Sequence, residues 1–227
     1  MTTFEGFPKK TLTFLRGIER NNTREWFEDH RTDYERFWLQ PARDFVDAAG
    51  VALQKVAPVS YEPKVNGSIF RINRDTRFAQ DKRPYKTYLD IWFWEGAARR
   101  TAVSGFYLRL SPKHIAIGAG AHRFGPDRLA TYRSAAADPT SGAALAKVVQ
   151  KVGRAGWPVK GEHYRRLPAG LEATTDLQAR LLRHNALWCG EDETVPGELH
   201  DRTFVRFAID RWKKLAPLHR WLVDSLD

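Results

Sequence analysis

The chain has 227 residues, of which 42% are hydrophobic and eight are tryptophans, a composition that supports a packed core and excludes a disordered chain. Its 37 lysines and arginines against 27 acids give a net charge of +10, which favours anionic partners such as nucleotides, phosphorylated metabolites, nucleic acid or anionic lipid, unless it reflects a basic proteome. A single cysteine excludes an intrachain disulfide, and because the sequence has no signal peptide or membrane-spanning run, we expect a soluble cytoplasmic protein.

Helical periodicity dominates the first quarter of the chain. Apolar residues recur at helical spacing and predict three helices, over about residues 8–20, 23–39 and 42–57. We expect Asn22 to cap the second helix, with Glu25 three residues later in a capping-box-like arrangement. The aromatic face of this helix, which includes Trp26 and His30, is more typical of a core than of a cofactor site.

The pattern then changes from helical to alternating. Successive strands are predicted at about residues 68–73, 85–94, 103–110 and 114–118. The alternation places Asp90 and Trp92 together on one face of the second strand, and Tyr107 and Arg109 together on one face of the third. Because no helix separates these strands, they predict an antiparallel meander. The small residues 118–121 are expected to end the meander and to let another group approach the backbone.

The second half of the chain is predicted to be mainly helical. Its helices cover about residues 126–137, 140–152, 176–184 and 198–226, the last bent near Pro217. A short edge strand at 187–189 and an acidic loop at 190–197 precede the last helix. Because the sequence contains no internal repeat and no flexible linker, we predict that residues 1–227 form a single α+β domain, an antiparallel β-meander packed against N-terminal and C-terminal helices.

The stretch with the most unusual composition is residues 64–88, KVNGSIFRINRDTRFAQDKRPYKTY. It holds seven basic residues against two acids and so carries +5 of the chain's +10. Guanidinium groups bind carboxylate and phosphate oxygens in a bidentate manner, so several of them around a concave place would form an anion site. The alternative is a solvated hairpin in which Asp75 and Asp81 pair with the arginines, since an acid among cations stays ionised.

Several segments carry a family resemblance. They are residues 21–27 (NNTREWF), 71–78 (RINRDTRF), 81–87 (DKRPYKT), 105–108 (GFYL) and 167–170 (LPAG). On these motifs the chain resembles a widespread family of uncharacterised bacterial and fungal proteins, classified as domain of unknown function 2461. The resemblance covers nearly the full chain. It implies a single full-length domain and no particular activity.

We predict that the basic hairpin binds a small anionic ligand bearing phosphate or carboxylate, either as a binding protein or as an enzyme. The residues expected to contact or border this ligand are Arg71, Arg74, Asp75, Arg77, Asp81, Lys82, Tyr85, Lys86, Asn22, Arg24, Trp26 and His122. The basic side chains would contact the anion, and the two aspartates would orient them. His122 would supply a general acid or base if it faces the same end of the sheet.

Two other functions stay open. The same hairpin can bind nucleic acid, by following its backbone with cations and stacking aromatic rings on its bases. It can equally be an ion-paired element of a structural or interaction domain without catalytic activity. The sequence has no HxH, HxxxH or HExxH pair and no P-loop, GxGxxG or GxSxG motif, so we predict no metal site and assign no cofactor. Cys189 is expected to pack as a small apolar residue.

Overall fold

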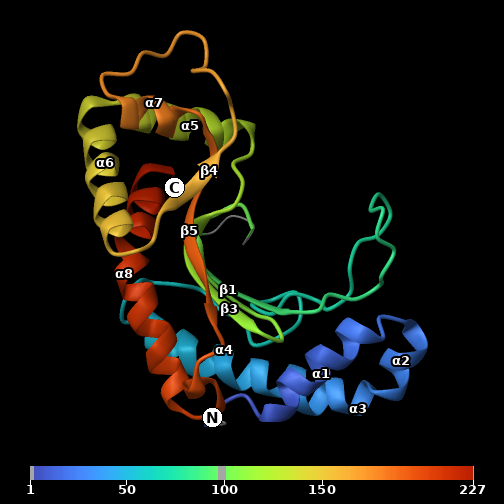
Figure 1. Cartoon of the computed structure of the whole chain (residues 1–227). Helices are drawn as coiled ribbons and strands as arrows, with labels where there is room; N and C mark the ends of the chain where they lie inside the picture. The colour runs from blue at the N-terminus through green and yellow to red at the C-terminus, as the bar shows by residue number, and fades with distance from the viewer. Residues whose placement is uncertain (1–2, 97–100, 227) are drawn as a thin grey trace.

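The computed structural model describes residues 3–96 and 101–226. Its centre is a five-stranded antiparallel sheet with the strand order β1-β2-β3-β5-β4 (Figure 1). The strands are β1 (Leu89–Trp94), β2 (Gly105–Leu110), β3 (His114–Ala121), β4 (Val159–Glu162) and β5 (His184–Thr194). The first three form the predicted meander, and the α+β class is confirmed. The sequence also predicts a turn over residues 96–100, of which 97–100 lie outside the described residues.

Strand β5 is the main departure from the prediction. We expected an edge strand at 187–189, whereas the strand has eleven residues and lies inside the sheet, paired with β3 on one side and β4 on the other. The small residues 118–121 do not end the meander but continue β3, where they pair with β5. Residues 190–194 of the predicted acidic loop belong to this strand. One of its acids, Glu193, accepts a hydrogen bond from Arg211 of the C-terminal helix at 2.8 Å.

Helices flank the sheet at both ends of the chain. The first group is α1 (Lys9–Arg20), α2 (Arg24–Asp29), α3 (Arg31–Asp33), a π-helical turn (Tyr34–Leu39) and α4 (Gln40–Leu53). The second group is α5 (Pro126–Ala137), α6 (Pro139–Arg154), α7 (Asp176–Leu182), a 3-10 turn (Gly197–His200) and α8 (Thr203–Leu226). The single helix predicted at 23–39 is divided into α2, α3 and the π-helical turn. Pro41 has no N–H for the carbonyl of Phe37, which accepts a hydrogen bond from the Thr11 hydroxyl at 2.5 Å instead.

Helix α8 covers one face of the sheet (Figure 1). Its Trp212 is fully buried, with its ring centroid 5.3 Å from that of Phe93 in β1 and 6.2 Å from that of Phe106 in β2. The indole N–H donates to the backbone carbonyl of Tyr107 at 3.2 Å. The residues that alternate with Phe93 and Phe106 therefore point to the opposite face of the sheet, where the candidate site lies.

A buried hydrogen-bond relay also joins α8 to the sheet. Nδ1 of His219 lies 2.9 Å from the hydroxyl of Ser104, and its Nε2 lies 2.8 Å from a carboxylate oxygen of Glu95. His219 and Ser104 are each 1% exposed. Burial lowers the pKa of His219, while the hydrogen bond and charge of Glu95 act in the opposite direction. The relay holds a neutral imidazole inside the core.

Cys189 of β5 is fully buried, as the sequence predicts. Its thiol donates to the backbone carbonyl of Ala119 in β3, with 3.7 Å between sulfur and oxygen. Burial is the main reason why the pKa of this thiol is raised to about 12. The side chain therefore behaves as a small apolar group, and it is not ionised near neutral pH.

Residues 62–88 form an arm that projects from the sheet beside the N-terminal helices (Figure 1). The strand predicted at 68–73 is wrong, because the arm pairs with its neighbours only through isolated bridges such as Ile69–Ile91 and Asn73–Tyr85. Ile69 and Ile72 are both buried. The chain bends at Ile72, between these two bridges, so the segment does not form a continuous strand.

Candidate functional site

The arginines of the arm are paired with the acids of the arm itself. Arg77 Nη2 lies 2.7 Å from Asp75, and both Arg74 and Arg83 lie 2.8 Å from Asp81. Hydrogen bonds from Arg77 are the main reason why the pKa of Asp75 is lowered to about 2, and those from Arg83 chiefly lower the pKa of Asp81. The two carboxylates are thus ionised and take up much of the hydrogen-bonding capacity of the three guanidinium groups.

The other predicted cations of the arm lie apart from one another. Arg71 is exposed, and Lys82 donates to the carbonyl of Thr76 at 3.0 Å. Lys86 lies 3.9 Å from a carboxylate oxygen of Asp90 and 5.3 Å from the ring centroid of Phe70. None of these three cations lines the cavity that is described below. The geometry favours the ion-paired hairpin that the sequence left open, while ligand binding by the arm stays a prediction.

Asn22 holds the arm to the N-terminal helices and does not cap one, so its predicted role as an N-cap is wrong. Its amide donates to the carbonyl of Tyr85 and accepts from the N–H of Tyr85, both at 3.0 Å. Thr23 is the actual cap, accepting from the N–H of Trp26 at 3.2 Å. Asn22 does not cap the helix because its side chain bonds both backbone groups of Tyr85, as a neighbouring strand would. The ring of Tyr85 is buried and stacks on that of Phe27, with 4.3 Å between the ring centroids.

Two further predicted residues, Arg24 and Trp26, lie on α2. Arg24 is exposed. Trp26 is half-buried against Gly17 of α1, where a Cβ would lie 2.5 Å from the indole ring, and it stacks on His30 with 3.9 Å between ring centroids. The indole therefore fills the space between α1 and α2. This packing agrees with the prediction that the aromatic face of this helix belongs to the core.

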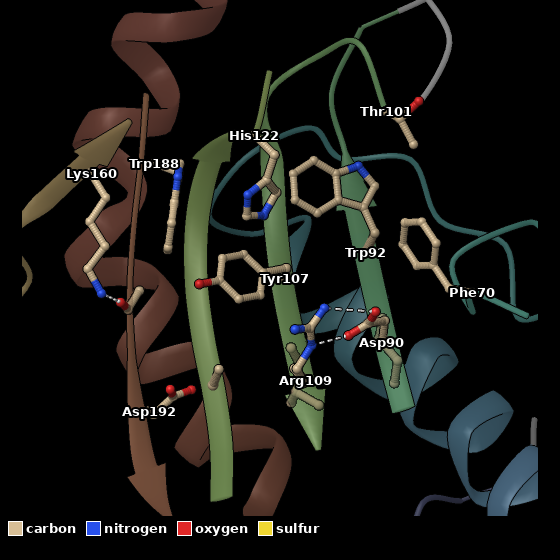
Figure 2. Close-up of a pocket in the computed structure, with 14 residues that line it drawn as sticks. Phe70, Asp90, Trp92, Thr101, Tyr107, Arg109, His122, Lys160, Trp188 and Asp192 are labelled. Atoms are coloured by element: carbon tan, nitrogen blue, oxygen red, sulfur yellow. Dashed lines mark hydrogen bonds and ion pairs between the residues drawn. The ribbon is translucent and has the colours of Figure 1, made fainter. Parts of the chain in front are cut away.

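A cavity of about 560 Å³ lies on the face of the sheet opposite α8 (Figure 2). This volume is within the range of small-molecule sites. Its lining comes from all five strands, from the arm, and from Thr101 and His122, which lie outside the strands: Phe70, Asp90, Ile91, Trp92, Thr101, Tyr107, Leu108, Arg109, Ala116, His122, Lys160, Trp188, Gly190 and Asp192. Of the twelve predicted site residues, His122 is the one that lines this cavity.

The register of the sheet arranges the lining in three rows that run across the strands. The first row is Asp90, Arg109, Ala116 and Asp192; the second is Trp92, Tyr107, Gly118 and Gly190; the third is Gly105, Gly120, Trp188 and Lys160. The first row holds three charged residues, and the other two rows are aromatic or small except for Lys160 at the end of the third. The cavity therefore has a charged end and an aromatic end.

His122 lies at the aromatic end, among three rings. Its ring centroid is 5.9 Å from that of Trp92, 5.2 Å from that of Tyr107 and 5.1 Å from that of Trp188. Desolvation by these rings and then the charge of Arg109 lower the pKa of His122, although the residue is exposed to solvent on its other side. No residue in the described part of the chain hydrogen-bonds its nitrogens. A neutral imidazole in this position can accept a proton from a ligand.

Tyr107 forms the middle of the floor, lying across β3 (Figure 2). Its ring occupies the space left by two glycines: a Cβ on Gly118 would lie 2.2 Å from the ring, and one on Gly190 would lie 1.9 Å from the hydroxyl oxygen. Burial raises the pKa of Tyr107, so the hydroxyl stays protonated and can donate a hydrogen bond to a ligand. Gly118, one of the small residues predicted to allow a close approach to the backbone, does so for this ring.

The charged end centres on Arg109. Its Nε and Nη2 donate to the two carboxylate oxygens of Asp90 at 2.6 and 3.1 Å, and its guanidinium carbon lies 4.0 Å from the ring centroid of Tyr88. Figure 2 shows the third nitrogen, Nη1, directed away from Asp90. At the side wall, Lys160 donates to the carbonyl of Gly190 at 2.8 Å. Arg109 is held rigidly by Asp90 and still has donors for an anionic group.

Across residues 3–96 and 101–226, no group of three or more His, Cys, Asp or Glu side chains is placed to hold a metal ion. None of the helices in these two ranges is long and apolar enough to cross a bilayer.

Comparison with known families agrees with the motifs found in the sequence. A family model described as conserved hypothetical protein (DUF2461) matches residues 10–221. The chain belongs to this family. The part that matches DUF2461 contains both the arm and every residue that lines the cavity. A search of curated proteins gives no match.

Proposed function

We propose that this DUF2461 protein binds a small organic molecule in the cavity, a molecule with a flat ring and a carboxylate or phosphate group. The observation that carries the proposal is the combination of His122 placed among Trp92, Tyr107 and Trp188 at one end with Arg109 at the other. Aromatic side chains bind the faces of flat rings, and a guanidinium group binds oxyanions.

The fixed position of Arg109 supports the anionic part of the proposal. Its bidentate pairing with Asp90 fixes the guanidinium plane, so a ligand that accepts from Nη1 does not have to order a flexible side chain. Lys160 adds a second positive charge at the wall, although it also pairs with Glu191 at 3.1 Å. The net charge of +10 attracts anions to the molecule from a distance.

Thermal unfolding with a panel of aromatic carboxylates and nucleoside monophosphates tests the proposal. A ligand at 100 times its Kd stabilises the folded state by about 2.7 kcal/mol, which raises Tm by roughly 5 to 10 °C for a chain of this size. We expect at least one member of the panel to do so, and Arg109→Ala and Trp188→Ala to abolish the shift.

The matched control is Arg31→Ala. Arg31 forms the same bidentate contact with Glu28, at 2.9 and 2.6 Å, on α2 and α3 outside the cavity. This variant should keep the full ligand-induced shift. If Arg74→Ala abolished the shift and Arg109→Ala did not, the ligand would bind the arm and not the cavity. If no member of the panel raised Tm, the proposed function would be wrong.

Single-stranded nucleic acid is a second candidate, favoured by rings on the uncovered face of an antiparallel sheet and on the arm. Phe78 is 95% exposed on the arm, with the guanidinium carbon of Arg77 at 5.9 Å from its ring centroid. Exposed rings beside cations can stack on bases while the cations follow the backbone. Fluorescence anisotropy with labelled oligonucleotides at two salt concentrations tests it: micromolar binding that weakens steeply with salt supports the candidate, and no binding below millimolar concentration rejects it.

A further inference from the structure

The charged end of the cavity presents two opposite charges to a ligand. Within the described part of the chain, no residue accepts a hydrogen bond from Nη1 of Arg109, and none forms a hydrogen bond or ion pair with the carboxylate of Asp192. The two other charged groups in the lining are engaged: Asp90 pairs with Arg109, and the ammonium of Lys160 contacts Gly190 and Glu191. Arg109 and Asp192 therefore have capacity left for a ligand.

The sheet register gives the distance between these two groups. Arg109 pairs with Ala116 of β3, and Ala116 pairs with Asp192 of β5, so the two charged residues lie two strands apart in one row. Neighbouring strands are about 4.8 Å apart, which places the two α-carbons roughly 10 Å from each other. Because the residue between them is an alanine, the space above it is open to the cavity.

A ligand group above Ala116 would meet both charges at once. A carboxylate or phosphate alone would be attracted by Arg109 and repelled by Asp192. An ammonium group alone would be attracted by Asp192 and repelled by Arg109. A group that has both an acid and an amine on neighbouring atoms satisfies Arg109 with the one and Asp192 with the other.

Building on the proposed function, we propose that the ligand is amphoteric, with a carboxylate facing Arg109, an ammonium group facing Asp192 and a flat ring at the aromatic end. Aromatic α-amino acids and their close derivatives have this arrangement. The aromatic ring would lie near Trp92 and Trp188, and the acid and amine would lie above Ala116. Tyr107 lies between the two ends and would contact the middle of the molecule.

Isothermal titration calorimetry with three indole compounds tests the proposal. Tryptophan carries both charged groups, tryptamine lacks the carboxylate, and indole-3-propionate lacks the amine. For the unaltered protein we expect tryptophan to bind at least tenfold more tightly than either of the others. Asp192→Asn should weaken tryptophan and tryptamine at least tenfold and leave indole-3-propionate unchanged or tighter, because only the first two place a cation beside the carboxylate.

Two controls keep the outcomes distinct. Asp210→Asn changes an exposed acid on α8, outside the cavity, and should leave all three affinities unchanged. Circular dichroism of Asp192→Asn checks that the variant is folded. If indole-3-propionate bound as tightly as tryptophan, and Asp192→Asn did not weaken tryptophan, the amphoteric ligand would be wrong while the proposed function stood. If none of the three compounds bound at 10 mM (roughly a 3 kcal/mol ceiling on affinity), this further inference would be wrong, and the wider panel of acids would decide the proposed function separately.

Discussion

Replacing Asn22 with alanine removes both hydrogen bonds that hold the arm to the N-terminal helices. In one bond the Asn22 amide nitrogen donates to the carbonyl of Tyr85, and in the other the Asn22 amide oxygen accepts from the N–H of Tyr85, each at 3.0 Å. A hydrogen bond contributes about 0.5 to 1.5 kcal/mol net, and a buried group left without a partner costs about 1 to 3 kcal/mol. Because Tyr85 is 5% exposed, we expect a loss of about 2 to 3 kcal/mol in the free energy of unfolding.

Urea unfolding measures this loss, and amide hydrogen exchange locates it. Exchange should accelerate in the arm more than in the central sheet, because the anchor acts on the arm. The neighbouring Asn21 provides a matched control: it is exposed and donates only to the carbonyl of Gly17 at 3.2 Å, so Asn21→Ala should cost less than about 1 kcal/mol. An Asn22→Ala variant within about 0.5 kcal/mol of the unaltered protein, with unchanged exchange in the arm, would refute the reasoning.

Three further predictions concern separate parts of the molecule. Gly190→Ala should destabilise the protein by about 1 to 3 kcal/mol in urea unfolding, because the new methyl group meets the hydroxyl of Tyr107, and Tyr107→Phe in the same chain should restore part of the loss. Because the pKa of His219 is lowered on folding, stability should fall as the pH decreases below about 6.5, and His219→Gln should reduce that dependence between pH 5 and 8. The carboxyl pKa of Asp75, measured by NMR, should rise from about 2 towards its usual value in Arg77→Ala; an unchanged pKa would contradict the pairing.

Local patterns were enough to predict much of the fold. Helix α5 has the predicted bounds 126–137, and the meander of β1, β2 and β3 follows from alternating residues without a crossover. The position of β5 could not be predicted, because it pairs with β3 only after two helices, β4 and α7 have intervened. Pairing between segments so distant in sequence depends on the packing of the whole sheet, which no local pattern contains.

The site was predicted only in part, for two physical reasons. The density of charge in residues 64–88 suggested an anion site, but arginines two residues from an aspartate can pair with it locally, as Arg77 does with Asp75. By contrast, the alternation that placed Asp90 with Trp92 and Tyr107 with Arg109 already contained four of the fourteen residues that line the cavity. The three lining residues of β5 depended on the register of that strand, which the sequence did not reveal.

The state of Cys189 has a practical consequence for experiments on this protein. Thiol reagents react with the thiolate form of cysteine. The thiol of Cys189 is fully buried and its pKa is raised to about 12, so almost none of it is ionised at pH 7. Because the chain has no second cysteine, a Phe78→Cys variant can be labelled with maleimide at that position on the arm with little background from the native thiol. A fluorophore there would report on the mobility and the surroundings of the arm without any other change to the chain.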